Sequence, residues 1–308
     1  MIVVGESELR VEAGARLELE GLTIANSTVS SALVVEGTAT VAQCTFLRCN
    51  TTRLNLVMGG VAETGVPNGV GASLASVGGA AFVRGTMDVT KSAFLDCSAT
   101  KGLIVAAGGA IYAGSGARLS VAQSELRRNE VEGGSWLNSG GAIFLYTKAS
   151  ATLDGSTLSE NRVLGGGLLS QGGAATVFFS ATMKVSSARV SDNLVSGGID
   201  STQGGAFFIM QGGLLTAFGT VFSTNTARCA DGASRGGAIY VFIQGRLAAT
   251  DVEFVENRAD AFAGAHGQGG ALYIYGSAEI QGATFLSNSA FGGSTRNEGG
   301  AVACDGAC

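Results

Sequence analysis

Short apolar runs return along this chain at a nearly constant spacing, and the tripeptide Gly-Gly-Ala opens each of them. The copies begin at Gly78, Gly108, Gly140, Gly172, Gly204, Gly236, Gly269 and Gly299, about 32 residues apart. A second motif recurs in phase with the first, in which an Asn follows a Phe, Leu or Val by three residues. A fixed period of this size is typical of repeat proteins, whose units bury their apolar faces only against their neighbours. The pattern therefore predicts one elongated, stacked body.

One repeat, residues 236–268, indicates which elements form the stack. Residues 239–243 are β-branched or aromatic, residues 246–250 alternate, and residues 251–257 end on the recurring Asn, which predicts three short strands. Residues 258–268 are small and contain Gly, which predicts a loop. Three strands, two tight turns and one longer loop make one rung of a right-handed parallel β-helix. The predicted fold is therefore all-β, a solenoid of about nine rungs.

The predicted β-helix forms a single domain, residues 1–308, with three parts. Residues 1–50 form shorter N-terminal rungs, and residues 51–77 form a Gly-rich insertion loop that contains the only Pro of the chain. Residues 78–308 form the regular Gly-Gly-Ala repeats. The last rung is truncated at Cys308, so we expect the chain to be a fragment of a longer protein.

Stacking places equivalent residues of successive rungs in columns. The Asn column has a structural explanation, because Asn tolerates the left-handed conformation of a tight turn and its amide can bond the next rung. Its members are Asn129, Asn161, Asn193, Asn225, Asn257 and Asn288.

Aromatic residues just after the Gly-Gly-Ala tripeptide form another column, opposite the aliphatic residues of the same strands. Its members are Tyr112, Phe144, Phe208, Tyr240 and Tyr273. If it is exposed, this column is an apolar platform for sugar rings or a protein partner. If the long loops cover it, it is a second core. These five residues are the candidate binding residues.

The two motifs in phase resemble the repeat of the chlamydial polymorphic outer-membrane proteins, with its GGAI and FxxN sequences. The best matches are residues 140–143 and 236–239 for the first motif, and residues 222–225, 254–257 and 285–288 for the second. The resemblance implies a pectin-lyase-like β-helix displayed at the cell surface, with a role in adhesion.

Charge and composition exclude several other functions. The net charge of −5 argues against a nucleic-acid partner, because phosphate binding needs a basic face. The chain has one His, His266, so we expect no metal site of several His residues, and no cofactor. No apolar run reaches the roughly 18 residues of a transmembrane segment. The start of the chain lacks the features of a signal peptide.

Carboxylates and cysteines supply the remaining candidates for chemistry. Glu160 and Asp192 precede the Asn of adjacent rungs, at a separation compatible with the carboxylate pair of a retaining glycosidase or with a Ca²⁺ site. A surface ion ladder with neighbouring Arg residues explains them more simply. Cys49 and Cys97 occupy the Asn column, within disulfide reach if their rungs are neighbours. Cys304 and Cys308 form a second candidate pair. Free buried thiols are the alternative for these cysteines.

The sequence favours a non-catalytic scaffold at the cell surface or in the extracellular space. We expect an adhesive or recognition face whose partners are glycans or cell-surface proteins. The alternative is a polysaccharide lyase or glycosidase of the pectin-lyase-like class. A third interpretation is that the chain is a purely structural segment of a larger protein.

Overall fold

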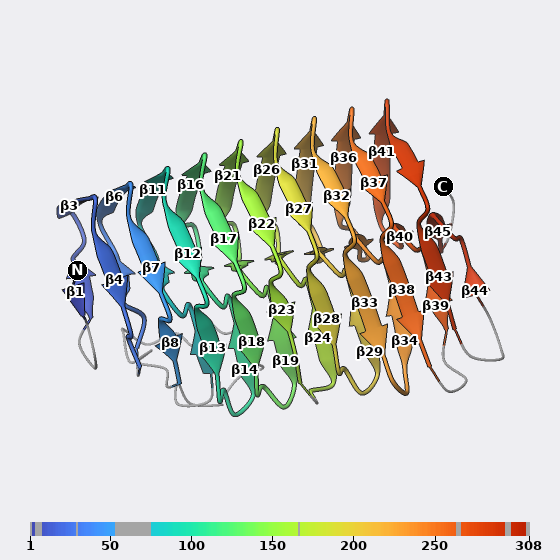
Figure 1. Ribbon diagram of the computed structural model, residues 1–308, viewed down its shortest axis with the longest axis horizontal. Coiled ribbons are helices and arrows are strands. Elements are labelled where there is room, and N and C mark those ends of the chain that lie inside the picture. Colours follow the sequence, from blue (N-terminus) through green and yellow to red (C-terminus); the bar gives the residue numbers. More distant parts are fainter. Residues whose placement is uncertain are drawn as a thin grey trace.

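The computed structural model describes residues 8–28, 30–52, 75–165, 167–262, 266–292 and 297–305, and the backbone of Ile2 and Val3. Every regular element in this part of the chain is a β-strand. It therefore includes no helix that is long and apolar enough to cross a membrane. The strands stack in parallel along one long axis, with the two ends of the chain at opposite ends of the stack (Figure 1).

The strands form five parallel sheets, which we call A to E, and each regular rung visits them in the order B, C, A, D, E. Sheet B consists of β2 (Leu9–Val11), β5 (Leu33–Val35), β10 (Ala81–Val83), β15 (Ile111–Ala113), β20 (Ile143–Leu145), β25 (Ala175–Val177), β30 (Phe207–Ile209), β35 (Ile239–Val241), β40 (Leu272–Ile274) and β45 (Val302–Cys304). Sheet C consists of β3 (Arg16–Glu20), β6 (Thr38–Ala42), β11 (Thr86–Thr90), β16 (Arg118–Ala122), β21 (Ser150–Asp154), β26 (Thr182–Ser186), β31 (Leu214–Phe218), β36 (Arg246–Thr250) and β41 (Ser277–Gln281). Sheet A consists of β1 (Ile2–Val3), β4 (Thr23–Ala25), β7 (Thr45–Leu47), β12 (Ala93–Leu95), β17 (Glu125–Arg127), β22 (Thr157–Ser159), β27 (Arg189–Ser191), β32 (Val221–Ser223), β37 (Glu253–Val255) and β42 (Thr284–Leu286).

The two remaining sheets come from the longer part of each rung. Sheet D consists of β8 (Asn50–Thr51), β13 (Ser98–Thr100), β18 (Glu130–Glu132), β23 (Arg162–Val163), β28 (Leu194–Ser196), β33 (Thr226–Cys229), β38 (Arg258–Ala261) and β43 (Ser289–Phe291). Sheet E consists of β9 (Ala75–Val77), β14 (Val105–Ala107), β19 (Leu137–Ser139), β24 (Leu169–Gln171), β29 (Ser201–Gln203), β34 (Ala233–Arg235), β39 (Gly267–Gln268) and β44 (Asn297–Glu298). This topology confirms the predicted parallel β-helix, and the nine strands of sheet C agree with the predicted number of rungs.

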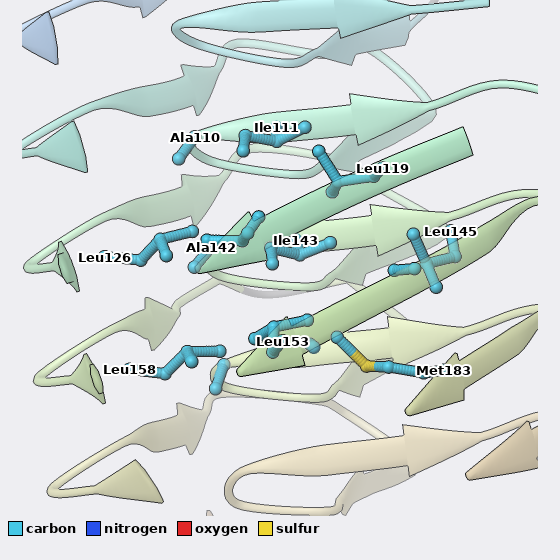
Figure 2. Close-up of a cluster of buried hydrophobic side chains, with 14 of the residues drawn as sticks. Ala110, Ile111, Leu119, Leu126, Ala142, Ile143, Leu145, Leu153, Leu158 and Met183 are labelled. Atoms are coloured by element: carbon cyan, nitrogen blue, oxygen red, sulfur yellow. The ribbon is translucent and has the colours of Figure 1, made fainter. Parts of the chain in front are cut away.

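Sheets A, B and C enclose the main core of the solenoid. Alternate residues of each strand point inward, because successive side chains of a strand face opposite sides. In this core Leu126 lies next to its counterpart Leu158 of the following rung, and Ile111 lies next to Ile143 (Figure 2). Aromatic rings repeat the stacking, with the ring centroids of Phe46 and Phe94 4.7 Å apart. Each fully buried side chain of this kind contributes about 1.5–3 kcal/mol.

Sheets D and E correct the prediction of a loop at residues 258–268. Arg258–Ala261 and Gly267–Gln268 are strands of these sheets. The middle residues of the D and E strands form a small core of Ala and Val, which includes Ala99, Ala106 and Val131. Small side chains are typical of loops, but here they allow two sheets to pack closely.

The Gly-Gly pair forms the turn that leads from sheet E into sheet B. Gly140 has φ of 67°, a left-handed conformation that Gly adopts without a steric penalty. A Cβ on Gly141 would lie 2.1 Å from the carbonyl oxygen of Gly173 on the next rung. The first Gly is therefore required by the backbone conformation and the second by the close approach of the neighbouring rung.

The first strands of sheets D and E, β8 and β9, follow several rungs of sheets A to C. In the described residues, the earlier N-terminal rungs contain neither strand. The predicted insertion loop, residues 51–77, begins in β8 and ends in β9, and its residues 53–74 lie outside the described part of the chain.

Candidate recognition surface

The Asn column lies at the turn between sheets A and D, where it forms a continuous hydrogen-bonded ladder. The Oδ1 of Asn161 accepts hydrogen bonds from the backbone N–H and the Nδ2 of Asn129 at 3.0 and 2.9 Å. Asn161 in turn donates from Nδ2 to Asn193 Oδ1 and to the carbonyl oxygen of Leu126. The same bonds recur through Asn225 and Asn257 to Asn288. The ladder satisfies buried backbone groups that a turn would otherwise leave unpaired.

A second ladder, which the sequence analysis missed, lies at the turn between sheets C and A. The backbone N–H of Ser92 donates to Ser124 Oγ at 3.0 Å, and the N–H of Ser124 donates to Ser156 Oγ at 3.2 Å. Each hydroxyl donates back to a carbonyl oxygen two residues earlier, as Ser124 does to Ala122 at 2.7 Å. The signal was present in the sequence, because each Ser precedes the buried anchor of sheet A by two residues. We call this turn the C–A corner.

A groove of about 480 Å³ runs across the C–A corner. Its lining comes from four successive rungs, each of which contributes one turn residue in the left-handed conformation. These turn residues are Gln43, Lys91, Gln123 and Gly155. The first positions of the sheet A strands complete the wall with Thr45, Glu125 and Thr157.

The groove is polar and rigidly supported. The side chains of Gln43, Lys91 and Gln123 are exposed, and the Ser ladder fixes the backbone below them. Neighbouring rungs of a sheet are about 4.8 Å apart, so the groove offers amide, ammonium and hydroxyl groups at a regular interval along the solenoid axis. Glu125 also lies 3.5 Å from the Nε of Arg127. This arrangement is suited to a long ligand with many hydroxyl groups.

The aromatic column is a second core and not an open platform. The exposed fractions of its side chains are 2% for Tyr112, 3% for Phe144, 0% for Phe208, 3% for Tyr240 and 4% for Tyr273. Val105 and Leu137 of sheet E pack with the rings of Tyr112 and Phe144. The other three rings form a separate cluster, with Met210 and Phe242 packed against it. The strands that hide the column lie in the segment of each rung that was predicted to be a loop.

The residues that sheet E places over the column become polar toward the C-terminus. Gln171 Nε2 donates to Gln203 Oε1 at 2.9 Å, and Arg235 Nε donates to Gln268 Oε1 at 2.9 Å. The guanidinium of Arg235 also lies 5.5 Å from the centre of the Tyr273 ring, a cation–π contact. This end of the second core therefore includes buried polar groups that are satisfied within the fold.

Burial makes two of these tyrosines sensitive to alkaline pH. Desolvation raises the pKa of Tyr273 to about 12, against its ordinary value of 10, and it also raises the pKa of Tyr240. The native state thus keeps its protons where the unfolded state loses them, so the stabilising contribution is complete below about pH 10 and is lost as the pH rises toward 12. We expect the urea midpoint to fall over this range, and to fall less in Tyr240→Phe and Tyr273→Phe.

Unfolding at several pH values, followed together with tyrosinate absorbance, tests this expectation. Tyr275→Phe is the matched control, because its ring is 39% exposed. An equal pH dependence in all three variants would show that the buried rings do not cause the loss.

The two carboxylate candidates lie at the turn between sheets A and D. Glu160 and Asp192 are on adjacent rungs, next to the paired residues Ser159 and Ser191, and Asp192 Oδ1 accepts a hydrogen bond from Thr224 Oγ1 at 2.6 Å. The ion pair of this column joins Arg128 to Asp96, with Nε to Oδ1 at 2.7 Å and Nη2 to Oδ2 at 3.0 Å. Arg128 lowers the pKa of the Asp96 carboxyl below its usual value. In the described residues, no three His, Cys, Asp or Glu side chains gather in a group that could hold a metal ion.

For Cys49 and Cys97 the structure supports the alternative of free buried thiols over the disulfide. Cys49 and Cys97 do lie on neighbouring rungs, but both are buried free thiols, as are Cys44 and Cys229. At the end of the Asn ladder, the backbone N–H of Cys97 donates to Asn129 Oδ1, so these thiols take the place of the amide in the first rungs. Cys304 is in a disulfide, and its predicted partner, Cys308, lies outside the described residues.

The class that these observations define is a parallel β-solenoid, consistent with the pectin-lyase-like fold. Comparison with models of known families, with curated proteins and with solved structures finds no match to this chain.

Proposed function

We propose that this chain is a non-catalytic recognition scaffold at the cell surface or in the extracellular space, and that the groove at the C–A corner binds a glycan. The observation that carries the proposal is the row of exposed Gln43, Lys91 and Gln123 side chains above the Ser ladder. The groove replaces the aromatic column as the candidate binding site, because the rings of that column are buried.

The chemistry of the groove is compatible with a sugar chain. Each Gln offers an amide donor and an acceptor, and Lys91 offers three donors, so neighbouring hydroxyl or carboxylate groups of a glycan can be bound at once. Rigid support reduces the ordering that binding requires. Repetition of a weak contact on successive rungs suits a ligand that is itself a repeating polymer.

The motifs GGAI and FxxN support the same proposal from another side. Their resemblance to the polymorphic outer-membrane protein repeat implies adhesion at a cell surface, and glycans or surface proteins would be the partners. The disulfide at Cys304 fits an oxidising compartment. Membership of that family is part of the proposal.

An array of defined neutral and acidic oligosaccharides tests the groove. We expect the intact chain to bind a subset of them, and we expect Lys91→Ala with Gln123→Ala to weaken that binding about tenfold, since each lost hydrogen bond is worth about 0.5–1.5 kcal/mol. Calorimetric titration with the best oligosaccharide gives the affinity of each variant.

Gln244→Ala is a matched control for Gln123→Ala. Both residues are exposed and left-handed, with φ of 58° and 49°, but Gln244 lies outside the groove lining. Equal binding by both variants would exclude the groove as the binding site. Oligosaccharide cleavage that disappears in Glu160→Gln would instead establish the glycosidase alternative.

A further inference from the structure

The sequence contains two Asn-x-Thr tripeptides, Asn26-Ser27-Thr28 and Asn50-Thr51-Thr52. Asn-x-Ser/Thr with x other than Pro is the acceptor signal for N-linked glycosylation. Both tripeptides lie near the N-terminal end of the solenoid, on neighbouring rungs, since the backbone N–H of Asn50 donates to the carbonyl oxygen of Ser27.

The fold places the acceptor side chains on the outside. Asn26 has φ of 60° and stands at the same turn position as Arg48 and Asp96, whose φ values are 54° and 55°. This is the outward position just before the ladder, and Asn26 is exposed, whereas the ladder position of its rung is taken by the buried Ser27. Asn50 is the first residue of β8 and is partly exposed. Its Oδ1 accepts a hydrogen bond from Thr100 Oγ1 at 3.1 Å.

The Asn residues of the ladder differ from Asn26 and Asn50 in the accessibility of the amide and in the residue two positions later. Their Nδ2 groups donate inside the protein, as Asn193 does to Leu158 and Asn225. None of them has Ser or Thr two residues later. The acceptor signal is therefore confined to the Asn residues that the fold leaves accessible.

We infer that Asn26 and Asn50 each carry an N-linked glycan; this rests on the extracellular location in the proposed function. The donor is an oligosaccharide linked to a polyprenyl diphosphate. A bond forms between Asn Nδ2 and C1 of the first sugar, the bond between C1 and the diphosphate oxygen breaks, and the polyprenyl diphosphate leaves with the electron pair. Nδ2 loses one proton, and nothing is oxidised or reduced.

The position of the glycans gives them a structural role. In the described residues, β8 is the first strand of sheet D, so that sheet has an edge at β8. Exposed edges invite pairing with other chains. The preceding rung covers part of this edge, since the Asn50 N–H and the Thr52 Oγ1 donate to the carbonyl oxygens of Ser27 and Thr28. Hydrated glycans at Asn26 and Asn50 would add to this cover and hinder the approach of another strand.

The test uses the full chain behind a secretion leader in cultured eukaryotic cells, with Thr28→Ala, Thr52→Ala and the double variant. We expect two glycan mass increments on the parent chain, one on each single variant and none on the double variant. Peptide N-glycosidase should remove all of them and convert both Asn residues to Asp. We also expect the deglycosylated chain to associate more readily in light scattering.

A secreted parent chain with either Asn unmodified overturns the inference and leaves the proposed function in place. The location is tested separately on the chain made by its own cells, by fractionation into surface, medium and cytosol. A cytosolic chain there would reject the extracellular location and the inference together. Since Thr28 is exposed, folding is not expected to be the reason for a missing increment, and strand circular dichroism of each variant checks this.

Discussion

Phe208→Ala is expected to lower the free energy of unfolding by about 3–5 kcal/mol, because it opens a cavity in the second core. The Phe208 side chain has no exposed surface. Its ring centre lies 5.4 Å from that of Tyr240 and 6.2 Å from that of Phe242. Urea unfolding of the full chain, followed by circular dichroism, measures the loss.

Phe218→Ala is the control for this truncation. The same side chain is removed from β31, the next strand along the chain, where it is 54% exposed. We expect a change within about 0.5 kcal/mol there. Similar losses for the two variants would mean that sheet E does not cover the aromatic column. The column would then become a candidate binding platform again.

Asn193→Ala is expected to cost about 2–4 kcal/mol, because buried polar groups on both neighbouring rungs lose a partner. The Asn193 amide takes part in four hydrogen bonds, two with Asn161 and one each with Leu158 and Asn225. The side chain is 1% exposed, so water cannot replace these bonds without opening the turn. The same urea experiment applies.

Asp192→Asn provides the comparison at the adjacent position. Asp192 is exposed and left-handed, and Asn tolerates that conformation and keeps the acceptor for Thr224. We expect little change in stability. A small effect of Asn193→Ala would show that the ladder contributes less than the packing of the sheets around it.

The period of the sequence was sufficient to predict the solenoid and the strands of sheets A, B and C. Gly141 shows why, since the contact that excludes a Cβ recurs on each rung and leaves Gly-Gly at a fixed spacing. Asn161 is similar, because its amide bonds to the amides of Asn129 and Asn193 at the same position of the neighbouring rungs. A residue that contacts the equivalent residue of the next rung recurs at a fixed spacing, so a single sequence is enough to reveal it.

The strands of sheets D and E were harder to predict from the sequence. Ala99 and Ala106 are small because two sheets meet there, and small residues are equally common in loops. Whether the aromatic column is buried depends on whether the segment after the Asn forms a loop or a sheet. The alternation of residues shows that Tyr112 and Phe144 share a face, but it does not show whether another sheet lies over that face. The groove was missed for a related reason, because exposed Gln and Lys side chains follow no pattern that the packing requires.

The matched register of the rungs allows the number of repeats to change during evolution. Most successive regular rungs pair with an offset of 32 residues, as Phe208 does with Tyr240. A duplication or loss of one rung's coding sequence there would rejoin strands that already fit. The length of the protein can therefore vary in whole steps without redesign of its interior. The groove at the C–A corner would lengthen or shorten by the same step, so recombination could change the length of the glycan that we propose it binds.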